Sequence, residues 1–244
     1  MALVRQHRDE DAIGKLRERV TSAPEDVAAR RLLVRLLASS GDLAGAKLEV
    51  AELERRSKEN DPMPRIELGH AYELAHQYEE ALAAYDEAAA IAPASAAGPR
   101  EGGMRCARWG EVEAARPRLE EAIKRGARDA VTFHTLGLVN THLRDFEAAE
   151  RAYRAGAAAD PKGAENWLGL ATLALVQGDA AKALEAYDAV LARSPRYAAG
   201  QLGRAWALAK LGRRADAAHA LDRAEELGAP RDNVAKQRAA LGTP

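Results

Sequence analysis

The residues of this chain that could do chemistry are six histidines, one cysteine and several groups of carboxylates. Two metal ligands on one helix usually lie one turn apart, but His134 and His142 are eight residues apart and no two histidines are four apart. The acidic runs RDEDA and HQYEEALAAYDEA are typical of helix starts and exposed helix faces, where water and the helix dipole favour carboxylates. We therefore expect no metal, no cofactor and no acid–base pair.

Cys106 is the single cysteine, so it cannot form a disulfide within the chain. We expect it to pack against neighbouring helices rather than to act as a nucleophile. The sequence also has none of the phosphate-binding, dinucleotide-binding, nucleophile-elbow or zinc-protease motifs. We therefore expect the protein not to be an enzyme.

The charges of the chain are almost balanced, with 36 lysines and arginines against 37 acidic residues. No general excess of positive charge indicates nucleic acid as a partner. The apolar run at the amino terminus gives way to charged residues from Arg5 onward, so it is too short for a signal peptide or a membrane span. We expect a cytoplasmic protein with no membrane insertion, or a periplasmic or lipid-anchored one if a leader has been removed.

A period of 34 residues organises the chain. Residues 130–163 and 164–197 align without a gap, and each carries an aromatic residue, a leucine followed by a small residue, an alanine, a tyrosine and a closing proline. These residues are Phe133, Leu136, Ala149, Tyr153 and Pro161 in the first stretch and Trp167, Leu170, Ala183, Tyr187 and Pro195 in the second. The pattern resembles that of the tetratricopeptide repeat (TPR) family.

The same register extends in both directions, so that residues 1–244 are predicted to form one repeat array. Full repeats are expected at 27–61, 62–95, 96–129, 130–163, 164–197 and 198–231, with an N-terminal half repeat at 8–26 and a C-terminal capping helix at 232–244. Pro99, Gly102 and Gly103 fall in the first helix of the repeat at 96–129. Proline and glycine weaken a helix interior, so we expect this helix to be the weakest.

The resemblance implies an all-α fold, a right-handed superhelical α-solenoid of tandem helix–turn–helix repeats. Each hairpin alone is too short to be stable, and it exposes an apolar side until a neighbour covers it. In this family the first helices of the repeats line a concave groove, which implies a site for a peptide or a helix of a partner protein. A homodimer, or the chain's own last helix in the groove, are the alternatives.

The groove positions of the family can be read from this sequence. They are predicted to be cationic in the amino-terminal half and apolar in the carboxy-terminal half. The predicted groove residues are Arg31, Arg35, Ile66, His70, Arg100, Met104, Arg108, His134, Leu138, Leu168, Thr172, Leu175, Leu202 and Trp206. The arginines indicate an acidic or phosphorylated partner segment, or else an ordinary solvated surface. Trp206 is either an interface anchor or part of the packing at the end of the array.

The function expected from this pattern is a non-enzymatic scaffold or adaptor for protein–protein interaction. One alternative is an assembly factor of a bacterial pilus or secretion apparatus, similar to the lipid-anchored pilotins. A second alternative is a regulatory domain of a larger protein. The Ala- and Arg-rich composition is typical of a bacterium with a GC-rich genome.

Overall fold

The computed structural model describes residues 2–242, with side chains from Asp9 onward. All regular secondary structure in this range is α-helical, which confirms the predicted all-α fold. The chain divides into two compact units, Met1–Ala127 and Arg128–Pro244. Among the described helices, none is both long and apolar enough to cross a lipid bilayer.

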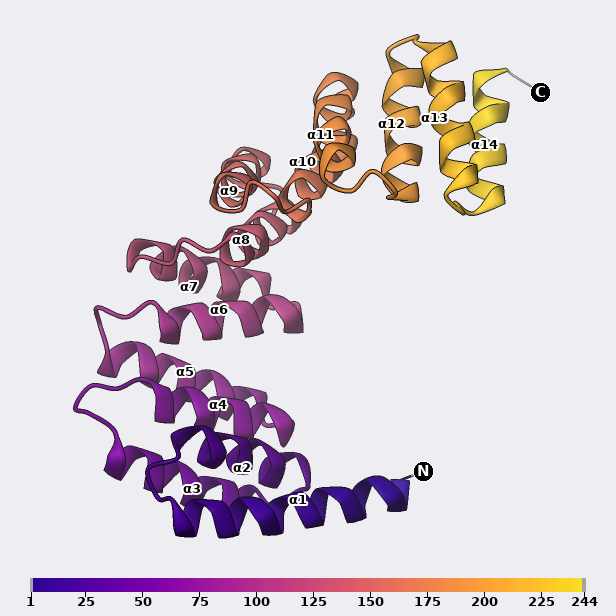
Figure 1. Ribbon diagram of the computed structural model, residues 1–244. Coiled ribbons are helices and arrows are strands. Elements are labelled where there is room, and N and C mark those ends of the chain that lie inside the picture. Colours follow the sequence, from indigo (N-terminus) through magenta and orange to yellow (C-terminus); the bar gives the residue numbers. More distant parts are fainter. Residues whose placement is uncertain (1, 243–244) are drawn as a thin grey trace. The chain divides into compact units, whose positions relative to one another are not determined.

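Each unit is a stack of helices that follow one another in chain order (Figure 1). The first unit contains α1 (Ala2–Ser22), α2 (Val27–Ser39), α3 (Leu43–Arg56), α4 (Met63–Leu74), α5 (Tyr78–Ile91), α6 (Ala97–Trp109) and α7 (Val112–Lys124). The second contains α8 (Ala130–His142), α9 (Phe146–Ala159), α10 (Glu165–Gln177), α11 (Ala180–Arg193), α12 (Ala198–Lys210), α13 (Arg214–Glu226) and α14 (Arg231–Leu241).

Aspartates begin many of these helices. An aspartate in front of the first turn accepts a hydrogen bond from a backbone N–H that has no partner within the helix. This cap is made by Asp26, Asp42, Asp129, Asp145 and Asp179, each to the backbone N–H three residues later. The helix starts are therefore encoded locally.

The turn within each helix pair contains one residue with positive φ. These residues are Gly41, His76, Gly110, Arg144, Gly178 and Gly212, so that from His76 onward they recur every 34 residues. Glycine adopts this left-handed conformation at no steric cost, whereas other residues are strained in it. His76 and Arg144 are thus two strained positions in an otherwise regular series of turns.

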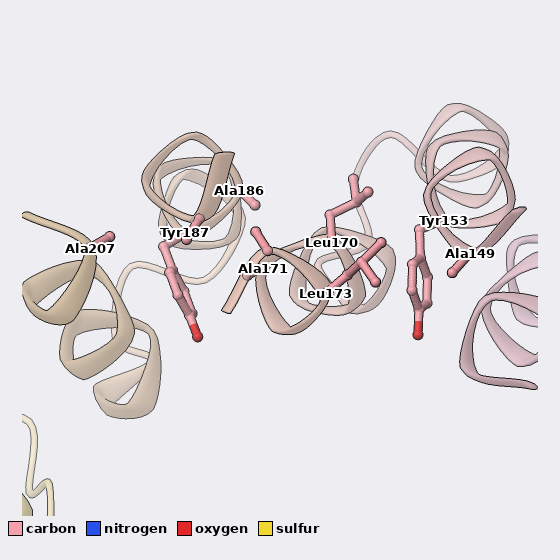
Figure 2. Packing of buried hydrophobic residues seen from close by; sticks show 10 residues of the cluster. Ala149, Tyr153, Leu170, Ala171, Leu173, Ala186, Tyr187 and Ala207 are labelled. Atoms are coloured by element: carbon pink, nitrogen blue, oxygen red, sulfur yellow. The ribbon is translucent and has the colours of Figure 1, made fainter. Parts of the chain in front are cut away.

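Tyrosines and glycines set the distance between neighbouring helices. Tyr153 and Tyr187 are buried, and Figure 2 shows their rings on either side of α10, which carries Leu170, Ala171 and Leu173. A Cβ added to Gly137 would lie 2.5 Å from the Tyr153 ring, and one added to Gly203 would lie 2.1 Å from the Tyr187 ring. The helix backbone lies directly on each ring, so no larger residue fits without a shift.

Helix α6, predicted to be the weakest first helix, extends without a break over Ala97–Trp109. Its glycines lie where the neighbouring helices come closest. A Cβ on Gly98 would lie 2.4 Å from the backbone N of Ala89, and one on Gly103 would lie 2.8 Å from the Leu119 side chain. The glycines that lower the intrinsic helix propensity therefore allow the close packing that offsets this loss.

The turns give a first prediction. Arg144→Gly should raise the free energy of unfolding by about 0.5–1 kcal/mol, because it removes left-handed strain of about 1–2 kcal/mol and adds some chain entropy to the unfolded state. Gly178→Ala should lower it by about 1 kcal/mol, since a Cβ at Gly178 meets no atom within 4 Å and only the backbone cost remains. Urea unfolding followed by circular dichroism measures both changes.

Arg144→Ala is the matched control for the first variant. It removes the guanidinium, which lies 5.6 Å from the centre of the Phe146 ring, but keeps the strained backbone. If Arg144→Ala stabilised the protein as much as Arg144→Gly, the arginine side chain and not the turn conformation would be the cause.

Candidate functional site

The first unit has an open cleft with a volume of about 620 Å³, and most of its lining residues come from every second helix of the stack. We call it the arginine cleft. It is lined by Arg35 and Ser39 of α2, His70, Glu73 and Leu74 of α4, His76 and Tyr78 at the start of α5, and Arg105, Arg108 and Trp109 of α6. Three helices one repeat apart therefore bring their side chains to one surface.

Glu67 lies beneath this surface and has no solvent exposure. Arg35 donates two hydrogen bonds to its carboxylate, at 2.9 and 2.8 Å, and Arg31 donates another at 2.6 Å. Burial raises the pKa of Glu67, but hydrogen bonds from His70, Arg35 and Arg31 outweigh this effect and lower the pKa to about 2. Glu67 is thus a buried carboxylate that ties α4 to α2.

His70 lies between two glutamates and two arginines. Its Nδ1 is 3.6 Å from Glu67 and its Nε2 is 3.4 Å from Glu101. An amino group of Arg105 lies 3.2 Å from Nε2. Burial lowers the pKa of His70, but the hydrogen bonds to Glu101 and Glu67 outweigh it, so the pKa is raised above its ordinary value.

The network continues across α6. Arg105 forms ion pairs with Glu73 at 3.1 Å and with Glu101 at 3.2 Å, and Arg108 donates to Glu73 at 3.2 Å. The side chains of Arg35 and Arg108 are 45% and 62% exposed, against 16% for Glu73. The carboxylates and Arg105 therefore form the floor of the cleft, and the guanidinium groups of Arg35 and Arg108 form its solvent-facing rim.

One side of the arginine cleft is aromatic. The rings of Tyr78 and Trp109 are 5.0 Å apart at a tilt of 52°. Nδ1 of His76 lies 3.2 Å from the hydroxyl of Tyr78. Tyr78 is 45% exposed, so this pair offers an aromatic surface beside the guanidinium groups.

The second unit has its own open cleft, with a volume of about 520 Å³. We call it the tryptophan cleft. It is lined by Leu175 of α10, Tyr187 of α11, Ala199, Leu202, Gly203 and Trp206 of α12, and Asn233, Lys236 and Gln237 of α14. The last helix thus forms a polar wall of this cleft and leaves its apolar side open.

The structure brings together six of the predicted groove residues, Arg35, His70 and Arg108 in the arginine cleft and Leu175, Leu202 and Trp206 in the tryptophan cleft. Ile66 does not belong to a groove: it is 2% exposed and packs in the core with Tyr85. Leu202 is 9% exposed and contributes mainly to the core of the second unit. Ile66 therefore lies in the core, and Leu202 lies between the core and the tryptophan cleft.

The remaining predicted residues lie outside the two clefts. Arg31 is paired with Glu67 and Arg100 with Glu101, while Met104 is half-buried on α6. His134 is half-buried against Tyr153, Leu168 packs against the core, Thr172 donates to the Leu168 carbonyl, and Leu138 is exposed. Among residues with described side chains, no three His, Cys, Asp or Glu lie together as a metal site would require.

Sequence reasoning missed the residues that neutralise or extend the predicted groove. These are Glu67, Glu101, Arg105, Tyr78, Trp109 and the α14 residues Asn233, Lys236 and Gln237. The sequence does contain a signal for these ion pairs. Glu67 follows Arg31 by 36 residues and Arg35 by 32 residues. Residues of opposite charge that are separated by one repeat length, plus or minus two residues, lie on neighbouring first helices and can form an ion pair.

The buried carboxylate gives a second prediction. A carboxyl group whose pKa is lowered on folding stabilises the protein above its unfolded pKa, and this stabilisation is lost as the pH falls through its folded pKa. For Glu67 the window runs from about 4.5 down to about 2. Wild type should exceed Glu67→Gln in free energy of unfolding by about 3 kcal/mol at pH 7, and the difference should shrink below pH 4.5.

Urea unfolding at several pH values between 7 and 3 measures this difference. Glu121→Gln is the matched control, because Glu121 is a solvent-accessible glutamate that pairs with Arg125 on its own helix, 2.8 Å away. It should change stability far less than Glu67→Gln does, because exposed ion pairs are weak. A Glu67→Gln difference that does not vary with pH would contradict a charged Glu67 in the folded protein.

Several solved structures have a similar fold. YrrB, described as a TPR protein with an unusual peptide-binding site, is 19% identical, with a TM-score of 0.67 over 78% of this chain and 97% of YrrB. A MamA protein is 18% identical, with a TM-score of 0.65 over 75% of this chain and 96% of its own. The C-terminal part of a TPR repeat-containing protein from Cytophaga hutchinsonii is 13% identical, with a TM-score of 0.73 over 96% of both chains.

Among curated protein sequences, none matches this chain. Two family models for the tetratricopeptide repeat do match it, one at residues 65–95 and the other at residues 135–198 and 168–233. These stretches together cover more than half of the chain. With the 34-residue turn period and the stacked helix pairs, they show that the chain belongs to the tetratricopeptide repeat family.

Proposed function

We propose that this protein is a non-enzymatic interaction scaffold that holds a segment of a partner protein on its first helices. The observation that carries the proposal is that each unit has an open cleft lined by alternate helices, α2, α4 and α6 in one and α10, α12 and α14 in the other. Concave sites lined by aromatic and apolar side chains with a few polar groups are typical of binding sites.

The two clefts suit different parts of a partner. The arginine cleft offers exposed guanidinium groups, which pair with carboxylates through charge-assisted hydrogen bonds. The tryptophan cleft offers Leu175 and Trp206 beside the polar wall of α14. Tryptophan is enriched among the residues that dominate binding energy at interfaces.

The comparison with solved structures supports the same function. YrrB has a similar fold and is described as having a peptide-binding site. A fold shared at 19% identity does not carry over any residue of that site. The proposal therefore depends on the clefts of this chain.

Site-specific photo-crosslinking in native lysate tests the proposal. A crosslinking amino acid at Leu74 in the arginine cleft or at Lys236 in the tryptophan cleft should form adducts with a discrete partner. The matched controls are Leu48 on α3 and Arg151 on α9, two exposed positions on second helices. Equal or exclusive crosslinking at the controls would sink the proposal.

A third prediction concerns the tryptophan cleft. Trp206→Ala combined with Leu175→Ala should weaken capture of the partner about tenfold or more, because both side chains line the cleft and anchor side chains contribute most of the binding energy. The helical circular-dichroism signal should stay nearly intact. A quantitative pull-down of the partner identified by crosslinking measures the loss of capture.

Leu184→Ala is the matched control for this double variant. Like Trp206 and Leu175, Leu184 packs against the core of the second unit, but it does not line the cleft. It should lower the melting temperature without affecting capture. Unchanged capture by the double variant would exclude the tryptophan cleft as the partner site.

A further inference from the structure

The arginine cleft combines two kinds of side chain on one helix. Arg105 and Trp109 of α6 are four residues apart and both line the cleft, and Arg108 lies between them. Residues four apart on a helix lie on one face, with Cβ atoms about 5–6 Å apart. A guanidinium group and an indole ring are thus presented side by side by one helical turn.

The charge of this surface determines whether it binds a positively or a negatively charged ligand. The most buried carboxylate, Glu67, is already held by two arginines, and Glu73 is held by Arg105 and Arg108. The guanidinium groups of Arg35 and Arg108 are the solvent-exposed ones, and the carboxylates beneath them are already paired. The surface that faces solvent is therefore positively charged. Charge complementarity therefore points to carboxylates.

The aromatic surface adds a second requirement. Tyr78 is 45% exposed although its ring packs on Trp109 and its hydroxyl lies within hydrogen-bonding distance of His76. A flat side chain that stacks on this pair would cover apolar surface of Tyr78 that the described residues of the first unit leave exposed. In an extended segment, residues two apart lie on one side and about 7 Å apart, close to the spacing along α6.

We propose that the arginine cleft recognises an extended partner segment in which a carboxylate side chain and an aromatic side chain are two residues apart. This inference rests on the scaffold function proposed above and names the chemistry of one of its sites. The carboxylate pairs with the exposed guanidinium group of Arg108, and the aromatic ring packs on Tyr78 and Trp109.

Binding of four dye-labelled nine-residue peptides, measured by fluorescence anisotropy with the full chain, tests this fourth prediction. The peptides are acetylated and amidated, so they carry no terminal charge. They contain Glu-Ser-Trp, Glu-Ser-Ala, Gln-Ser-Trp or Gln-Ser-Ala within a Gly/Ser sequence. The Glu-Ser-Trp peptide should bind at least about tenfold more tightly than Gln-Ser-Ala, and less tightly as salt rises.

Two variants separate the two contacts. Arg108→Gln should reduce the preference for Glu over Gln by about threefold, the effect expected for an exposed ion pair. Tyr78→Ala should reduce the preference for Trp over Ala by about threefold to tenfold. Arg151→Gln and Tyr197→Ala, exposed residues of the same types in the second unit, should change neither preference.

Equal binding of the four peptides, or preferences that survive in both variants, would overturn the inference. A peptide with phosphoserine in place of Glu that binds more tightly than the Glu peptide would also overturn it, because the site would then select phosphate. The proposed scaffold function would still stand in these cases if a partner crosslinks at Leu74 or Lys236. Loss of all crosslinking in the clefts would instead remove the scaffold function itself.

Discussion

The rest of this structure depends on one constraint: no helix pair of the chain can cover its own apolar side. Helices of twelve to fourteen residues are marginal alone in water, so each pair is stable only when the next pair packs on it. This requirement explains why Tyr153 lies against glycines both of its own helix pair and of the next one, Gly137 and Gly169. It also places contacts about one repeat apart in the sequence.

Polar side chains follow the same rule. Arg35 and Glu67 are 32 residues apart, and Arg105 and His70 are 35 apart, because alternate helices are neighbours in the stack. Charged residues on α2, α4 and α6 therefore contact charges of the neighbouring repeats. The arginine cleft results from a few positions where guanidinium groups outnumber the carboxylates and remain closer to solvent.

The fold could be predicted from the sequence because its determinants are local and repeated: aspartate caps, turn glycines and a leucine–tyrosine pattern with a fixed period. The site could be predicted only in part. Of the predicted groove positions, Arg35, His70 and Trp206 line the clefts, whereas Ile66 packs in the core. The partners Glu67 and Arg105 were missed because family positions treat each repeat alone, whereas charge is shared between repeats.

The turn at His76 carries a consequence for engineering the protein. Four of the six equivalent turns use glycine, and the backbone at His76 has a φ of 59°, which a glycine would adopt without strain. The imidazole at this position lies beside the hydroxyl of Tyr78, next to the aromatic surface. A consensus redesign that placed glycine there would gain thermal tolerance and lose the contact with Tyr78, so stability and the proposed recognition compete at a single residue.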